Sequence, residues 1–311
     1  MIKIIKSNFI NYTIGCILLL VCSSNCFAQR EIIMSQYMYN KYSINPAFAG
    51  SHESLSLFAS YRKQWLGFDH SASGGIATIH SPLKNETMAL GAQVYSEKVG
   101  VTNNTGFNIS YAYRTNISNT TKLSFALSAG FYNQNNNWSD VTIIDPEDPL
   151  FGYAEQLSAP WLGFGTAVYN NNYFIGLSIP SLVYSDNYET GENKLDFGKI
   201  DYLFTGGYFF HINSNFTLNP ATLVRVNPNT TSFIDFSTTA IINNALICGV
   251  SYRTTNEIVG ILGYQISPQT RITYSLDYTL EKLSNYNNGT HEIALQFNFG
   301  YKINTPNPKF F

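Results

Sequence analysis

Five histidines are the first candidates for metal binding or acid–base catalysis: His52, His70, His80, His211 and His291. None of them forms an H-E-x-x-H motif or a close ligand pair, so a metal site has little support. His291 and Glu292 are neighbours, but adjacent residues of a strand point to opposite faces. No G-x-S-x-G motif marks a nucleophilic serine. We therefore predict no catalytic, cofactor-binding or metal-binding residues and a protein that is not an enzyme.

An acidic stretch, Asp145-Pro146-Glu147-Asp148-Pro149, could offer oxygen ligands to calcium. Calcium loops carry a glycine at the turn and ligands at alternating positions, and this stretch lacks both. A solvated loop is therefore favoured, and such a loop could form part of a protein-binding surface.

Five arginines lie at the ends of predicted strands or on their polar face: Arg62, Arg114, Arg225, Arg253 and Arg271. These arginines could line a charged lumen, or they could pair inside a lumen with carboxylates such as Asp235 and Asp277. We favour pairing.

Gly163 and Gly165 flank Phe164 in a predicted strand. There they would let neighbouring side chains pack in a lumen, and they do not form a phosphate loop.

The stretch His291–Ile303 indicates that most of the candidate residues above lie on β-strands. Large apolar side chains occupy alternate positions, and small or polar side chains occupy the others. A β-strand sends alternate side chains to opposite faces, so this stretch has one apolar face over about twelve residues. A tilted strand crosses a hydrocarbon layer in ~9–11 residues. We interpret the stretch as the closing strand of a transmembrane antiparallel β-barrel.

The composition agrees with a barrel. Only 12% of the residues are charged, against roughly 25% in soluble domains. Tyr and Phe number 22 each, yet after the N-terminus no apolar run reaches the ~18 residues of a membrane helix. A secreted β-sandwich is the less favoured alternative. The formal net charge of −2 gives no basic face for nucleic acid.

Alternation predicts about fourteen strands, an even number as bacterial barrels require. They cover 53–61, 71–80, 88–99, 105–114, 121–133, 161–169, 173–179, 201–211, 217–226, 231–240, 245–253, 257–266, 270–278 and 291–303. Every second connection is short, and the longest, Gln134–Pro160, Pro180–Ile200 and Thr279–Thr290, all fall in the other set, of which four members are also short. If the first strand leaves the periplasm, the long connections face the exterior. Aromatic residues at strand ends predict interfacial girdles: Tyr132, Trp161, Tyr169, Tyr173, Tyr264 and Tyr301.

Residues 1–28 have the pattern of a secretory signal peptide, with Lys3 and Lys6, an apolar Ile14–Val21 and a small residue, Ala28, before the cleavage site. A lipoprotein anchor at one of two leader cysteines is the less favoured alternative. Cys248 is the one cysteine left in the mature chain, so no internal disulfide is expected. Residues 29–52 contain turn formers and a proline; we expect a periplasmic segment that tucks into the barrel mouth or the lumen as a small plug. Residues 53–311 are predicted to form the barrel.

The chain resembles the PorP/SprF family of outer-membrane proteins. The resemblance rests on Gln36-Tyr37-Met38-Tyr39-Asn40, Asn45-Pro46-Ala47-Phe48-Ala49-Gly50-Ser51, Tyr61-Arg62-Lys63-Gln64-Trp65, Gly249-Val250-Ser251-Tyr252-Arg253 and the ending Asn307-Pro308-Lys309-Phe310-Phe311. It runs from about Ser35 to the C-terminus. Lys309 stands where the family has Arg, which keeps the charge but not the planar fork.

The resemblance implies a barrel of the type IX secretion and gliding-motility systems, which serves export or surface retention of large adhesins with a C-terminal sorting domain. It implies cargo at the outer face, and secretion or motility components on the periplasmic side. The shared motifs suggest a plug or partner-contact role for Gln36, Tyr37, Asn45, Pro46, Ala47, Gly50, Tyr61, Arg62, Gln64 and Trp65. A diffusion channel or transporter for small solutes and a barrel hydrolase are the alternatives.

Overall fold

The computed structural model describes residues 34–83, 86–137, 155–182, 184–185, 193–194, 200–228 and 230–300. The predicted leader, the acidic stretch 145–149 and the ending 307–311 lie outside these residues. No helix among them is long and apolar enough to cross a membrane. Short 3-10 helices are η1 (Lys41–Ser43), η2 (Pro46–Phe48) and η5 (Lys282–Tyr286).

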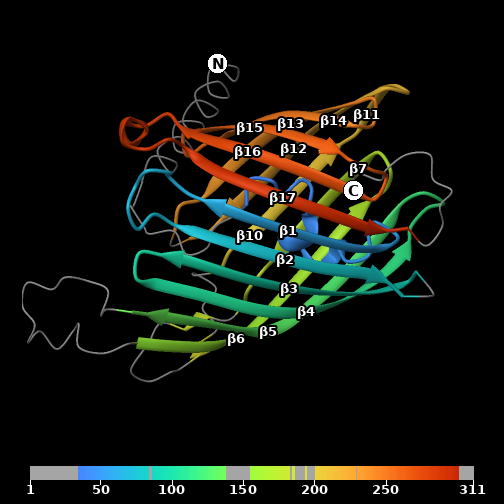
Figure 1. The fold of residues 1–311 in the computed structure, drawn as a ribbon. Coiled ribbons are helices and arrows are strands. Elements are labelled where there is room, and N and C mark those ends of the chain that lie inside the picture. The colour runs from blue at the N-terminus through green and yellow to red at the C-terminus, as the bar shows by residue number, and fades with distance from the viewer. Residues whose placement is uncertain are drawn as a thin grey trace, which may run out of the picture.

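Antiparallel strands form a closed barrel (Figure 1). The strands are β1 (Leu55–Lys63), β2 (Ser73–Pro82), β3 (Met88–Val99), β4 (Thr102–Asn116), β5 (Lys122–Asn136), β6 (Glu155–Tyr169), β7 (Tyr173–Ile179), β10 (Tyr202–Tyr208), β11 (Phe210–Asn213), β12 (Phe216–Val226), β13 (Phe233–Ile242), β14 (Leu246–Arg253), β15 (Glu257–Gln265), β16 (Thr270–Thr279) and β17 (Thr290–Phe299). A separate hairpin joins β8 (Tyr184–Ser185) to β9 (Asn193–Lys194).

Closure is made by two pairings, β1 with β17 and β10 with β12. Within the described residues the ring holds β1 to β7, β10 and β12 to β17, which is the predicted set of fourteen. The predicted strand 201–211 is divided, because the backbone N–H of Phe209 donates to the carbonyl of Asn172 (2.6 Å) in the β6–β7 turn, outside the ladder. β11 continues beyond this break against β12.

The alternation of side chains is as predicted. On β17 Ile293 and Leu295 are 50% and 49% exposed on the outer wall, whereas Glu292 and Gln296 are 1% and 2% exposed on the inside. The same pattern holds along β4, β5, β15 and β16. An apolar outer band with a polar interior is the arrangement of a membrane-spanning barrel.

The longest connections lie at one end of the barrel, although the β3–β4 and β14–β15 turns at that end are short. The outer mouth is defined here as the end that carries the β1–β2, β5–β6 and β16–β17 connections, which the sequence predicts to face the exterior. The inner mouth is the opposite end, with the β2–β3, β4–β5 and β6–β7 turns. β4, β5 and β6 each have 15 residues, against 9 in β1, and extend farther at the outer mouth (Figure 1).

Some sequence expectations need correction. The connection predicted at 134–160 is shorter, because β5 continues to Asn136 and β6 begins at Glu155. Ladder hydrogen bonds hold these polar residues in strands, although they have no apolar period. β17 ends at Phe299, and Gly300 lies outside the strand. The girdle prediction is wrong for Trp161 and Tyr169, which are each 5% exposed and face the lumen.

Candidate functional site

The interior of the barrel is occupied by residues 34–54, here called the N-terminal segment, drawn in blue in Figure 1. Its polar groups bond to strands on different sides of the ring. Tyr37 Oη donates to Asp235 Oδ1 on β13 (3.2 Å), and Asn40 Nδ2 donates to Thr78 Oγ1 on β2 (3.1 Å). A segment fixed to opposite walls spans the lumen.

Further along the segment, Asn45 reaches the wall on the other side. Its Nδ2 donates to the carbonyls of Thr166 on β6 (3.1 Å) and Leu177 on β7 (3.2 Å). Ser178 Oγ donates in return to the carbonyl of Ile44 (2.6 Å). These bonds satisfy polar groups of a stretch that makes no sheet of its own.

The local sequence explains why this stretch turns twice. Asn45 caps η2, where its Oδ1 accepts from the N–H of Ala47 (2.9 Å), and Pro46 takes the first helical position. Gly50 has φ +68°, and a Cβ there would lie 2.7 Å from Ala89 Cβ. Only glycine meets both demands without strain. Pro46 thus begins a turn, as predicted, and does not sit in a strand.

An ion cluster near the outer mouth anchors the start of the segment. Arg62 Nη2 lies 2.7 Å from Asp277 Oδ2, and Arg62 Nη1 lies 3.3 Å from Glu292 Oε2. Ser35 joins both carboxylates: its N–H donates to Glu292 (2.8 Å) and its hydroxyl donates to Asp277 (2.5 Å). All four residues are at most 3% exposed. Arg62 on β1, Asp277 on β16 and Glu292 on β17 are thus held by the segment.

Two more arginines pair with carboxylates in the same half of the barrel. Arg253 Nη2 lies 3.2 Å from Asp235 Oδ2, and its Nη1 lies 2.8 Å from Glu257 Oε2. Arg225 binds Asp201 through two N–H donors, each at 2.9 Å. The prediction that the inward arginines pair with carboxylates inside a lumen, with Asp235 and Asp277 among the partners, is confirmed for Arg62, Arg225 and Arg253. Arg114 donates instead to the carbonyl of Gly50 (2.7 Å), and Arg271 donates to Gln265 Oε1 (3.0 Å).

The inner mouth holds a different group. His80 Nδ1 accepts the N–H of Gly50 (3.0 Å), and Arg114 Nη1 donates to the carbonyl of the same glycine (2.7 Å). The ring of His52 stacks on that of His80 with centroids 5.1 Å apart. His80 and Arg114 of the barrel wall therefore hold the end of the segment at Gly50 and His52. Because Ser35 lies near the outer mouth and Gly50 near the inner mouth, the segment runs the length of the lumen.

Lys41 is buried toward the inner mouth, beside the β6–β7 turn. Its Nζ lies 4.4 Å from the ring centroid of Phe174 and 5.8 Å from that of Phe209. Burial, together with the nearby Arg271 guanidinium, lowers the pKa of Lys41 to about 7. Aromatic faces stabilise a cation in such a place.

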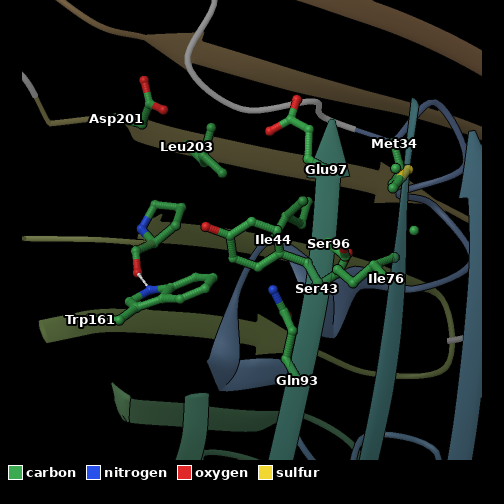
Figure 2. A pocket seen from close by; sticks show the side chains of 14 residues that line it. Met34, Ser43, Ile44, Ile76, Gln93, Ser96, Glu97, Trp161, Asp201 and Leu203 are labelled. Carbon is green, nitrogen blue, oxygen red and sulfur yellow. Dashed lines mark hydrogen bonds between the residues drawn. The ribbon is translucent and has the colours of Figure 1, made fainter. Parts of the chain in front are cut away.

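A cavity of about 80 Å³ lies beside the segment toward the outer mouth (Figure 2). In Figure 2 Glu97 and Asp201 lie on one side of this space and Gln93 on the other. Trp161 closes a third side, and its indole N–H donates to the carbonyl of Pro180. The lining is mixed, with apolar walls and a carboxylate-bearing edge.

Most of the ten residues singled out from the sequence lie together inside the barrel. Those within the N-terminal segment and the ion cluster are buried: Gln36, Tyr37, Asn45, Pro46, Ala47, Gly50 and Arg62. Tyr61 is 54% exposed on the outer wall. Gln64 and Trp65 are half-buried in the β1–β2 connection, where the N–H of Trp65 donates to Thr290 Oγ1 (3.1 Å).

Several residues of this site gave no signal in the sequence. Ser35 precedes the Gln36–Asn40 block, and Ser178 and Thr78 look like ordinary inward strand residues. Among the described residues no three His, Cys, Asp or Glu side chains are grouped to hold a metal. The arrangement is suited to fixing a chain segment by hydrogen bonds and ion pairs.

Comparisons with known proteins point to one family. A family described as "Type IX secretion system membrane protein PorP/SprF" matches residues 26–297. No curated protein matches the chain. Solved structures that it resembles include Omp33 of Acinetobacter baumannii, with 8% identity, a TM-score of 0.46, and coverage of 80% of this chain and 100% of that chain. The toluene transporter TbuX of Ralstonia pickettii has 12% identity, a TM-score of 0.49 and coverage of 83% and 93%. The toluene transporter TodX of P. putida has 9% identity, a TM-score of 0.47 and coverage of 87% and 95%.

Proposed function

Because the chain belongs to the PorP/SprF family of type IX secretion system membrane proteins, we propose that it is a non-enzymatic outer-membrane barrel that anchors large secreted surface proteins or assists their export. Its cargo would carry a C-terminal sorting domain, and periplasmic components of secretion or motility would meet the inner mouth. A signal peptide at residues 1–28 would direct the chain to the periplasm.

The filled lumen is the observation that carries this proposal. The N-terminal segment bonds to β2, β6, β7, β13, β16 and β17. Its departure from the lumen would leave many polar groups of the wall without hydrogen-bond partners, which costs free energy. A barrel that anchors a protein at the cell surface does not need an open channel through its lumen. The cavity of about 80 Å³ is about half of the ~150 Å³ void that accepts benzene, so it is small for a free aromatic solute.

The buried family motifs fit this role. Gln36, Tyr37 and Asn45 are at most 1% exposed, so they would act by holding the segment and not by touching a partner. Gln64 and Trp65 lie in the β1–β2 connection at the outer mouth, so they remain candidates for contact with a partner protein. We therefore propose a plug role for the buried residues of the N-terminal segment and a partner-contact role for Gln64 and Trp65.

The raised rim made by β4, β5 and β6 is the proposed contact for cargo. Its inner and outer faces carry amide and hydroxyl side chains, among them Asn103, Gln134, Asn135 and Ser158. Amide-rich edges bind through hydrogen bonds and bury little apolar surface, which suits a contact that is made and released. Residues 138–154 connect β5 to β6 in the sequence, and we propose that they also contact the cargo.

The test is a pull-down of the tagged barrel from outer membranes in mild detergent, followed by mass spectrometry. Recovery of a large protein with a C-terminal sorting domain, in fixed ratio, is expected. A variant without residues 138–154 should still insert but release that protein into the medium. A matched variant shortened in the inner β4–β5 turn should retain it. A solitary barrel with steady single-channel conductance would favour the alternative, a solute channel.

A further inference from the structure

A groove of about 430 Å³ lies on the outer wall of the barrel, on the surface that faces lipid. It crosses β17, β1, β2 and β3, which are neighbours in the sheet (Figure 1). Its floor is formed by outward alanines, Ala59, Ala77 and Ala92, and its sides include Leu295 and Val94. The lining is therefore almost wholly hydrocarbon.

The strand register explains the shape. Ala59 pairs with Leu295 on one side and with Ala77 on the other, and Ala77 pairs with Val94. Along this row two small side chains thus lie between two large ones. One row closer to the outer mouth, Gly75 on β2 pairs with Tyr61, whose outward ring would lie 3.8 Å from a Cβ at Gly75. Strands are ~4.8 Å apart, so the trough is wide enough for an extended acyl chain.

Basic side chains lie beyond the trough toward the outer mouth, two outward rows past the row of Ala59 and Ala77. Lys63, Ser73 and Lys98 pair in one row across β1, β2 and β3, and all three face outward. Lys63 Nζ donates to the carbonyl of Ser71 (3.1 Å), and Lys98 is exposed. Within the described residues neither amine has a carboxylate partner.

The spacing matches one leaflet of a bilayer. From Lys63 to Leu57, at the far end of the groove, are six residues, which span ~20 Å along a strand. At a tilt of ~40° this is ~15 Å of depth, about half of the ~30 Å hydrocarbon layer. The lysines therefore stand at headgroup level when the groove reaches the middle of the membrane.

We propose that this groove binds a phosphate-bearing lipid of the outer leaflet, with one acyl chain in the trough and the phosphate on Lys63 and Lys98. The apolar lining takes hydrocarbon, and the two amines supply the charge that a phosphate requires. An apolar helix of a partner protein would leave both amines without a counter-charge. The outer surface of β1, β2 and β3 would then be a specific lipid-binding site.

Native mass spectrometry of the purified barrel tests the proposal, with phosphatidylglycerol and phosphatidylcholine of identical acyl chains as probes. Phosphatidylglycerol should bind roughly thirtyfold more tightly, since each lysine near the headgroup contributes a factor of about five. The variant Lys63→Gln/Lys98→Gln should bind both lipids alike. The variant Ala59→Leu/Ala77→Leu, which fills the trough, should weaken both.

Matched controls separate the site from the rest of the surface. Lys282→Gln removes an exposed lysine of η5, and Ala129→Leu enlarges an outward alanine of β5; both should bind as the parent does. Heat-modifiable mobility in SDS gels verifies that each variant is folded. Equal binding of the two lipids by the parent would overturn the proposal. Undiminished binding by the trough-filled variant would also overturn it.

Discussion

Arg62 and Asp277 form an ion pair inside the barrel, with Nη2 2.7 Å from Oδ2 and the side chains 4% and 3% exposed. Glu292 lies 3.3 Å from the same guanidinium, so one cation faces two carboxylates. Ser35 donates to both carboxylates and brings the N-terminal segment into the cluster. The cluster therefore couples the seam between β1 and β17 to the filling of the lumen.

Arg62→Gln should destabilise the folded barrel by about 3–5 kcal/mol, because it leaves two buried carboxylates without their cation. Asp277→Asn should cost clearly less, because Arg62 and Glu292 still balance one another. Urea unfolding in detergent micelles measures both. Equal losses in the two variants would contradict the shared-cation arrangement.

Gly165→Ala tests the contact between the segment and β6. A Cβ at Gly165 would collide with Asn45 Oδ1 and lie 3.0 Å from Pro46 Cδ. Asn45 is held by two carbonyls, so it cannot move aside freely. We expect a loss of about 1–3 kcal/mol in the free energy of unfolding. Gly260→Ala is the control, since its Cβ would meet nothing within 4 Å. A loss as large at Gly260 would show that the effect comes from the strand backbone.

Much of this fold could be predicted because a barrel strand repeats every two residues. The alternation around Ile293 and Leu295 is enough to assign lipid and lumen faces, and most strand cores follow. The burial of Gln36 and Asn45 follows from their place in an apolar stretch rich in turn formers. The pairing of inward arginines with carboxylates follows from the cost of an unpaired charge.

The partners within the lumen could not be predicted. Ser35 and Glu292 are 257 positions apart, and their meeting depends on how far the ring is sheared when it closes. Trp161 and Tyr169 were expected in a girdle because aromatic residues favour interfaces, but their phase on β6 turns them inward. The outer ends of β5 and β6 are polar and do not alternate with apolar residues, so the full length of these strands could not be predicted from the sequence.

Leu295→Arg tests the assignment of the lipid face. Leu295 is 49% exposed near the middle of β17, and an arginine there should cost about 2–4 kcal/mol. His291→Arg places the same side chain on the same face near the outer end of the strand, where the cost falls to about 0–1 kcal/mol. Unfolding in lipid vesicles measures both. Similar stabilities would show that Leu295 does not face hydrocarbon.

Removing residues 34–50 tests whether the segment closes the lumen. The shortened barrel should conduct ions steadily in planar bilayers, because the space held by Tyr37, Tyr42 and Phe48 becomes water. The parent should conduct far less. Tyr42→Phe is the control, since it removes only the hydrogen bond to Ser110 (2.7 Å) and should stay closed. Steady conductance by the parent would instead support a solute channel.

The direction of the segment predicts where the mature N-terminus lies. Ser35 bonds to Glu292 near the outer mouth, and cleavage before Gln29 would leave six residues ahead of it. Six extended residues span at most ~20 Å, too little to return across ~30 Å of hydrocarbon to the periplasm. An epitope tag placed after Gln29 should therefore bind antibody on intact cells. A tag at the C-terminus, beyond β17 at the inner mouth, should bind only after the cells are permeabilised. Protection of the N-terminal tag with exposure of the C-terminal one would reverse the orientation of the barrel, and protection of both would contradict the threading of the segment.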